Sequence, residues 1–199
     1  MSDHYYTSNP STPHQRKSLA VTLGGHTLTL NSDSGVFSKN GVDYGSKVLI
    51  EAMQIEDQDE VLDVGCGYGP IGLIAAKKAN NGHVTMIDVN GRAIELAKEN
   101  AIANGISNVT ILESDLFAAL TEDCEFDVVL TNPPIRAGKA VVHAIFEGAY
   151  DRLKQGGALW IVIQKKQGAP SAKAKLEELF RVVEEITKDK GYRIFKAIK

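Results

Sequence analysis

The sequence is poor in cysteine and lacks long apolar runs. Its 199 residues contain two cysteines, Cys66 and Cys124, whose spacing suits neither a metal site nor a disulfide framework. We therefore expect no metal ion and a reduced, cytoplasmic protein. No apolar stretch approaches the ~20 residues that span a membrane. The N-terminus has no basic segment followed by an apolar one, so we expect neither a signal peptide nor a membrane partner.

An excess of positive charge is also missing. The 22 Lys and Arg residues are outnumbered by 25 Asp and Glu, which gives a formal net charge of −3. Nucleic-acid-binding domains often carry a basic footprint, so any contact with RNA must come from a local patch. The hydrophobic content of 43% over 199 residues is enough for one domain with a full core.

Strand-like and helix-like patterns alternate from residue 59 onward. Residues 1–18 are polar and read as a flexible arm. Residues 19–58 predict a β-hairpin around a Gly-Gly turn, and then a helix capped by Ser46. The alternation over 59–199 predicts a doubly wound, mainly parallel sheet, closed by an antiparallel strand pair. A single domain over 19–199 follows, with predicted elements that include a helix from Lys139 to Leu153 and a strand from Ala158 to Ile163.

A glycine-rich turn follows the first strand of the alternating region. The apolar strand ends at Val64, and the turn contains Gly65, Gly67 and Gly69. Strand, turn and helix in this order form the nucleotide site of open α/β sheets, although an ordinary tight turn has the same glycines. Asp63 argues against a pyrophosphate, which it would repel by roughly 1 kcal/mol in water and about 4 kcal/mol near a protein surface at ~4 Å. S-adenosylmethionine has no phosphate and a cationic end, so it suits this carboxylate better.

Other residues of the same region are candidate cofactor contacts. Asp88 ends the second strand, where an acidic residue accepts hydrogen bonds from ribose hydroxyls, and Val89 follows it. Asp115 comes after the third strand, where it can reach an adenine amino group or simply stabilise a turn. Leu116 beside it can pack on the adenine ring. Cys66 lies within the glycine turn and is interpreted as a small packing residue.

The fourth strand is followed by Asn132, Pro133 and Pro134. The prolines restrict the backbone and donate no N–H, which leaves carbonyl oxygens as the local polar groups. An amide oxygen beside a backbone carbonyl is a rigid pair of acceptors for a planar –NH2 group. Such a pair helps an amine nitrogen become nucleophilic by positioning and fixed dipoles, with little general-base work and no need of a metal. The pattern therefore predicts a catalytic site for N-methylation.

Together these motifs resemble the class I S-adenosylmethionine-dependent methyltransferases that act on amino nitrogens. The stretches 35–39, 43–46 and 92–101 resemble, more narrowly, the family of small-subunit ribosomal RNA guanine-N2 methyltransferases. That resemblance covers about residues 19–199. It implies a seven-stranded Rossmann-like sheet with a reversed last strand, S-adenosylmethionine as cofactor, and ribosomal RNA or the small subunit as partner.

Two departures from that family affect the substrate. Many bacterial members resemble two fused methyltransferase-like domains, whereas this chain has the motifs of the catalytic one. Ile135 stands where an aromatic residue usually stacks on the target base, a contact worth roughly 1–3 kcal/mol. Phe37 and Tyr44 are therefore the candidates for a stacking face, or else core residues. Basic residues near the expected mouth, which can contact phosphate or form a solvated rim, are Lys39, Arg136, Lys139, Lys165, Lys166 and Arg193.

We predict methylation of a guanine N2 group in 16S-type ribosomal RNA. Two other enzymes use the same acceptor pair: a protein methyltransferase acting on a glutamine side-chain amide, and an adenine-N6 methyltransferase of nucleic acid. A binding module that has kept the fold without activity is a further alternative, and cofactor affinity distinguishes it from an enzyme.

Overall fold

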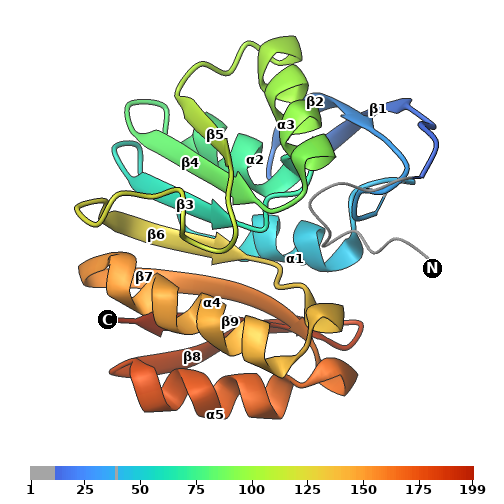
Figure 1. The fold of residues 1–199 in the computed structure, drawn as a ribbon. Coiled ribbons are helices and arrows are strands. Elements are labelled where there is room, and N and C mark those ends of the chain that lie inside the picture. The colour runs from blue at the N-terminus through green and yellow to red at the C-terminus, as the bar shows by residue number, and fades with distance from the viewer. Residues whose placement is uncertain (1–11, 39) are drawn as a thin grey trace.

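The computed structural model describes residues 12–38 and 40–199, which are built around a seven-stranded sheet (Figure 1). The strand order is β5-β4-β3-β6-β7-β9-β8, and only the two pairings that involve β9 are antiparallel. This confirms the predicted mainly parallel, doubly wound sheet with a reversed last strand. The strands are β3 (Glu60–Val64), β4 (His83–Asp88), β5 (Val109–Glu113), β6 (Phe126–Thr131), β7 (Leu153–Gln164), β8 (Val182–Asp189) and β9 (Tyr192–Ile198).

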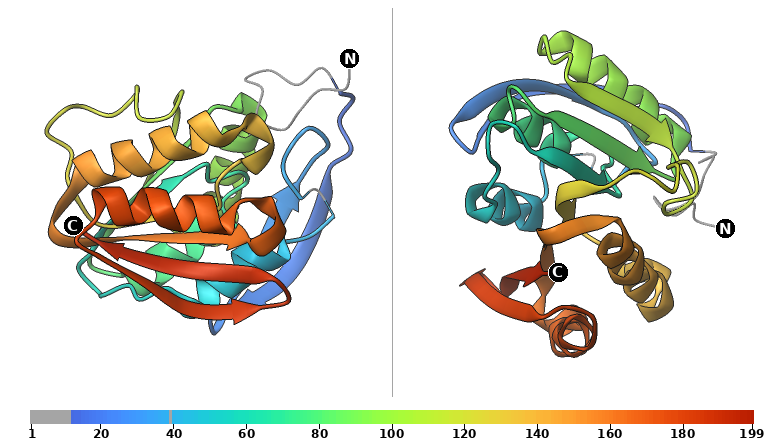
Figure 2. Two further views of the ribbon diagram at one scale, coloured as in Figure 1. Left: turned by 90° about the horizontal axis from the view of Figure 1, so that it is seen from below. Right: turned by 90° about the vertical axis from the view of Figure 1, so that its left-hand side faces the viewer.

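Helices cover both faces of this sheet (Figure 2). On one face lie α1 (Tyr44–Ala52), α2 (Pro70–Lys78) and α3 (Gly91–Ala103), and on the other lie α4 (Lys139–Arg152) and α5 (Ala169–Leu179). Successive residues of a strand point to opposite faces, so Val61 joins one core and Leu62 the other. Both faces are buried, which is why the central strands are apolar throughout. None of the helices in the described residues is long and apolar enough to cross a membrane.

The predicted N-terminal hairpin consists of β1 (Lys17–Leu23) and β2 (His26–Ser32), and it begins two residues earlier than expected. Residues 1–11 of the predicted arm lie outside the described part. Two asparagines one turn apart dock the hairpin, Asn100 on α3 and Asn104 at the C-cap of that helix. The side chain of Asn100 exchanges hydrogen bonds of 2.7 and 3.0 Å with the backbone of Asn31, and Asn104 does the same with Thr29 at 2.9 and 2.8 Å.

Two boundaries differ from the sequence prediction. Ser46 does not cap α1; Asp43 does, through its carboxylate, which accepts a hydrogen bond from the Ser46 amide at 3.1 Å. The strand predicted to begin at Ala158 begins at Leu153 instead, because Leu153 pairs with Phe126 of β6. An irregularity in register separates this pair from the next, Val128 with Ala158. Glycine within a strand commonly accompanies such a bulge, and Gly156 has a φ of 80°.

We expect Gly148→Ala to destabilise the protein even though alanine favours helices by about 1 kcal/mol. Gly148 lies in α4, and a Cβ there would approach Phe117 Cε2 to 2.2 Å. Phe117 belongs to the turns that connect β5 to β6. Crowding of this kind costs roughly 1–3 kcal/mol, measurable by urea unfolding. In a Phe117→Leu background the same substitution should become neutral or stabilising; equal effects in both backgrounds would contradict this contact.

Candidate active site

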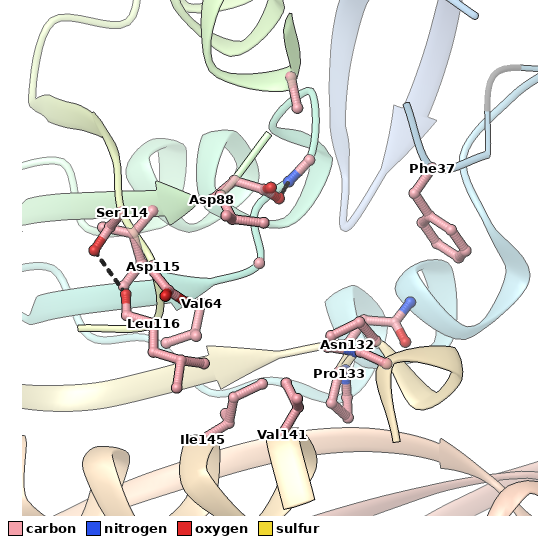
Figure 3. A pocket seen from close by; sticks show the side chains of 17 residues that line it. Phe37, Val64, Asp88, Ser114, Asp115, Leu116, Asn132, Pro133, Val141 and Ile145 are labelled. Atoms are coloured by element: carbon pink, nitrogen blue, oxygen red, sulfur yellow. Dashed lines mark hydrogen bonds between the residues drawn. The ribbon is translucent and has the colours of Figure 1, made fainter. Parts of the chain in front are cut away.

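A cavity of about 320 Å³ opens at the carboxyl ends of the parallel strands (Figure 3). It lies where the chain order reverses, since β3 has β4 on one side and β6 on the other. Ligands of open α/β sheets bind at such a switch point, and the volume is in the range of small-molecule sites. The cavity is lined by Phe37, Val64, Gly65, Gly67, Ile87, Asp88, Val89, Ala93, Ser114, Asp115, Leu116, Asn132, Pro133, Pro134, Ala137, Val141 and Ile145.

The glycine turn gives this cavity an open floor of backbone. Gly65 and Gly67 have φ values of 74° and 57°, and a Cβ at either position would meet nothing within 4 Å. The backbone conformation disfavours larger residues, and the space beside it is left for a ligand. Gly69, with φ of 103°, starts α2 without a side-chain cap. The turn therefore fits a bound nucleoside-type cofactor.

Asp88 is held on the cavity wall by two backbone amides. Its Oδ2 accepts a hydrogen bond from Gly67 at 2.8 Å and its Oδ1 accepts one from Asn90 at 2.9 Å. Burial raises the pKa of Asp88, and the amides of Asn90, Gly67 and Val89 offset part of that rise. Each carboxylate oxygen can accept more than one hydrogen bond, so both remain able to bind ribose hydroxyls.

The loop after β5 forms the wall next to Asp88, across the cavity from Phe37 and Asn132, as Figure 3 shows. The buried Ser114 stabilises this loop: its hydroxyl donates to Leu116 O at 2.8 Å and accepts from the Ala119 amide at 3.0 Å. Leu116 has a φ of 49°, which is uncommon for a residue with a side chain. Asp115 is exposed and faces the cavity.

Asn132 leaves β6 at the edge of the cavity, followed by Pro133 and Pro134. Its Nδ2 donates hydrogen bonds of 3.0 Å to Asp43 Oδ2 and of 3.0 Å to Ser46 Oγ. The carboxamide is therefore tied to the beginning of α1. Phe37 lines the cavity from the preceding loop and is 37% exposed.

Asp63 is placed differently from the other candidates. It is fully buried outside the cavity lining, with Oδ2 2.9 Å from the position that a Cβ on Gly72 would take. Neither carboxylate oxygen has a hydrogen-bond partner among the described residues. Burial raises the pKa of Asp63 to about 7. The Gly72 amide, which lies nearby without a well-formed hydrogen bond, lowers it somewhat, and the charge of Asp88 adds to the rise.

Several other predicted site residues also lie outside this lining. Cys66 borders a second, smaller cavity of about 30 Å³, which shares Phe37, Gly65, Gly67 and Asn132 with the first. The Tyr44 hydroxyl donates to Asp189, and its ring lies 4.5 Å from Lys190 Nζ. The remaining residues that the main lining omits are Gly69, Ile135, Arg136 and Lys139.

Sequence reasoning missed part of the lining and the partners of Asn132. Val141 and Ile145 are one turn apart on α4, and this spacing behind the prolines was a usable signal. Ser114 could also have been predicted from the sequence, because it lies between the third strand and Asp115. Asp43 and Ser46 carried no such signal, because 89 and 86 residues separate them from Asn132.

The strand order and a cavity at the switch point define a Rossmann-like methyltransferase fold. The chain belongs to the methyltransferase small domain family, whose model matches residues 27–196. The predicted class, an S-adenosylmethionine-dependent methyltransferase, is thereby confirmed, and so is the prediction that S-adenosylmethionine is the cofactor.

The chain matches one relative over its full length and others over about half of theirs. An uncharacterized Bacillus subtilis protein, YbxB, is 54% identical over the full length of both chains. Ribosomal RNA small subunit methyltransferase C of Klebsiella pneumoniae is 30% identical over 86% of this chain and 49% of its own. The structure of the T. thermophilus 16S rRNA N2 G1207 methyltransferase (RsmC), in complex with AdoMet and guanosine, matches with a TM-score of 0.84 and 28% identity over 96% of this chain and 52% of that one. The chain thus spans about half the length of these rRNA methyltransferases.

We expect Asp63→Asn to change how stability depends on pH. The pKa of Asp63 is about 7 in the folded protein against a usual value of 3.8, so the folded state favours the protonated form. The free energy of unfolding gained from this preference is present in full below about pH 4. It is lost as the pH rises through 7, a change of about 4 kcal/mol. Denaturant unfolding at pH 4 and pH 8 should show the wild type losing that much relative to the variant; parallel pH profiles would contradict it.

We expect Asp88→Ala to weaken cofactor binding by roughly 100-fold, because two hydrogen bonds to a charged acceptor are lost. Calorimetry with S-adenosylhomocysteine and with an analogue lacking both ribose hydroxyls measures this. The wild type should discriminate between the two ligands and the variant should not. Discrimination that survives in the variant would assign ribose recognition to another residue.

Proposed function

We propose that this protein transfers a methyl group from S-adenosylmethionine to the N2 amino group of a guanine in 16S-type ribosomal RNA. The carrying observation is the carboxamide of Asn132, placed beside two prolines on the wall of a cavity that also contains Asp88. The similarity to rRNA methyltransferase C supports the nucleic-acid substrate. We further propose that residues 19–199 act as one catalytic domain.

In this proposal the cofactor lies along the edge of the sheet. Asp88 accepts hydrogen bonds from the ribose, while Asp115 accepts one from the adenine amino group and Leu116 packs on the ring. Val89 and the turn from Gly65 to Gly69, Cys66 included, contact the remainder. Asp63 acts from beneath this turn as a negative charge, which favours a cationic ligand.

Asn132 holds the amine that becomes methylated. The cofactor supplies an electrophilic methyl group. Asn132 Oδ1 and a backbone carbonyl beside Pro133 and Pro134 accept the two N–H hydrogens of the guanine amine, which is planar because its lone pair is delocalised into the ring. Held in this way, the nitrogen would direct its lone pair toward the methyl group while the bond from that methyl group to the sulfonium sulfur breaks, and the surplus proton would then pass to solvent water. Rate enhancement comes from orientation and fixed dipoles.

Phe37 is the proposed stacking surface for the base. It is an exposed aromatic residue in the cavity lining, on the same side as Asn132 (Figure 3). Ile135 is partly buried against the core beneath α4 and α5 and offers no aromatic face. Tyr44 contacts the turn between β8 and β9 instead.

Exposed cations at the same edge of the sheet are the proposed contacts to RNA phosphates. Arg136 lies in the short helix η1 (Ile135–Ala137), and Lys139 begins α4. Lys165 and Lys166 follow β7 in the short helix η2 (Lys165–Gln167). These four are exposed and have no ion pair within the described residues. Of the other two basic candidates, Arg193 is paired with Glu185 at 2.6 Å, and Lys39 lies outside the described residues.

The test is transfer of a tritiated methyl group to naked rRNA, small ribosomal subunits and a ribosomal protein fraction, followed by analysis of the labelled products. The proposal requires label in N2-methylguanosine. Label in N6-methyladenosine, or in a methylated glutamine amide, would replace the proposed substrate by one of the two alternatives that use the same acceptor pair.

We expect Asn132→Ala to lower kcat at least 100-fold, the size of effect seen when one stabilising dipole is removed. Its affinity for S-adenosylmethionine should stay within a few-fold of wild type, because other residues bind the cofactor. Asn81→Ala, in an exposed turn, is the matched control. Equal loss of cofactor affinity and turnover would make Asn132 a structural residue.

A further inference from the structure

The side chain of Asn132 is bound at one end by two residues of the N-terminal segment. Its Nδ2 donates to Asp43 Oδ2 and to Ser46 Oγ, each at 3.0 Å. These bonds use both hydrogens of the amide nitrogen. Oδ1 is then the acceptor that remains for a substrate amine.

The two partners are not equivalent in what they require of Asn132. A hydroxyl such as that of Ser46 can donate or accept, so it fits either orientation of a carboxamide. An ionised carboxylate only accepts, so Asp43 fits the orientation in which Nδ2 faces it and opposes the one in which Oδ1 does. The charge of Asp43 therefore determines which end of the Asn132 amide faces the cavity.

Asp43 is itself fixed in place. It caps α1, accepting from the Ser46 amide at 3.1 Å, while its carbonyl accepts from the Lys47 amide at 3.0 Å. Gly45 allows this close arrangement, because a Cβ there would lie 2.8 Å from the Tyr192 ring and 3.0 Å from Asp43 Oδ2. The beginning of α1 thus presents a rigid acceptor to Asn132.

We propose that Asp43 is a positioning residue for N-methylation: its carboxylate locks the Asn132 amide with Oδ1 toward the substrate amine, and Ser46 supports this lock. The inference rests on the proposed function, in which Oδ1 accepts a hydrogen bond from the amine. It gives the beginning of α1, which precedes every strand of the parallel sheet in the chain, a role in positioning Asn132.

Asp43→Ser is the decisive variant, because serine caps helices as well as aspartate does, so α1 should stay intact. The new hydroxyl can donate as well as accept, so it fits either end of the Asn132 amide and the lock is lost. Asparagine would not test this, since Asp43 Oδ2 accepts from both the Ser46 amide and Asn132 Nδ2, and the oxygen of an asparagine cap would keep both bonds. We expect kcat to fall roughly 10- to 100-fold, the range for losing a partner that orients a functional ligand. Melting temperature and cofactor affinity should stay close to wild type. Ser46→Ala should cost less than tenfold, and Asp151→Asn, an exposed charge on α4, is the control for net charge.

The double variant Asp43→Ser/Asn132→Asp tests the mechanism by rescue. Asn132→Asp alone places two carboxylates in contact and should be nearly inactive. In the double variant the serine hydroxyl can donate to the carboxylate, which has an acceptor oxygen at both ends and needs no lock. We expect its kcat to exceed that of both single variants. A double variant whose loss of kcat equals the product of the two single losses would overturn the proposal.

A measurement without substrate separates this inference from the proposed function. The side-chain NH2 resonances of Asn132, identified by their absence in Asn132→Asp, should exchange with solvent at least tenfold faster in Asp43→Ser than in wild type. Unchanged exchange, or unchanged kcat in Asp43→Ser, would overturn the positioning role. A wild-type protein that methylates no substrate while this protection is present would overturn the proposed function alone.

Discussion

The site depends on a parallel hydrogen-bond ladder that continues past the ends of its strands. The amides of Gly65 and Cys66 both donate to Ile87 O, at 2.8 and 3.0 Å, and the Ser114 amide donates to Asp88 O at 2.9 Å. Thr131 Oγ1 donates to Val64 O at 2.9 Å. The loops after β3, β4, β5 and β6 therefore leave the sheet in register with one another. A cavity wall assembled from four separate loops becomes as rigid as the sheet below it.

The N-terminal extension completes this site from the other side. Asn90 donates to Gly35 O at 2.8 Å and Arg92 to Ser34 O at 2.8 Å, so the beginning of α3 holds the loop that carries Phe37. Farther along α3, Asn100 also donates to Tyr68 O at 2.8 Å and so links the hairpin to the glycine turn. The loop between β2 and α1 consequently forms part of the cavity wall, and the hairpin and α1 support it. Their contacts explain why an extension outside the sheet bears on the chemistry proposed for Asn132.

Charge is distributed in two zones around the cavity. Asp63 and Asp88 lie at its inner side, and burial raises the pKa of both carboxyls. A cationic ligand would offset that cost by stabilising their ionised forms. The exposed cations Arg136 and Lys139 lie on the outer edge. This arrangement supports a cationic cofactor inside and a polyanionic substrate outside, although the formal charge of the whole chain is −3.

Much of the core and the order of its elements followed from local pattern. Apolar runs bounded by turns, separated by helix-length segments, were sufficient to predict a mainly parallel sheet closed by an antiparallel strand pair. The seven strands with a reversed last strand were what the family resemblance implied. Boundaries failed where a distant partner overrode the local signal. The strand β7 begins at Leu153 because that residue pairs with Phe126 of β6, although Gly156 and Gly157 read locally as a break. Ser46 looked like a helix cap, but its amide and hydroxyl serve Asp43 and Asn132 instead.

The sequence by itself determined the class of fold and the residues at the carboxyl ends of its strands. Parallel pairing obliges those ends to meet at one edge, so Asp88, Asp115 and Asn132 had to be neighbours. Only the tertiary structure decided which side chains share the cavity and how they are oriented. It buried Asp63 beneath the glycine turn, placed Tyr44 outside and Phe37 inside, and paired Asn132 with Asp43. The physical reason is that side-chain hydrogen bonds across 89 residues leave no periodicity in the sequence.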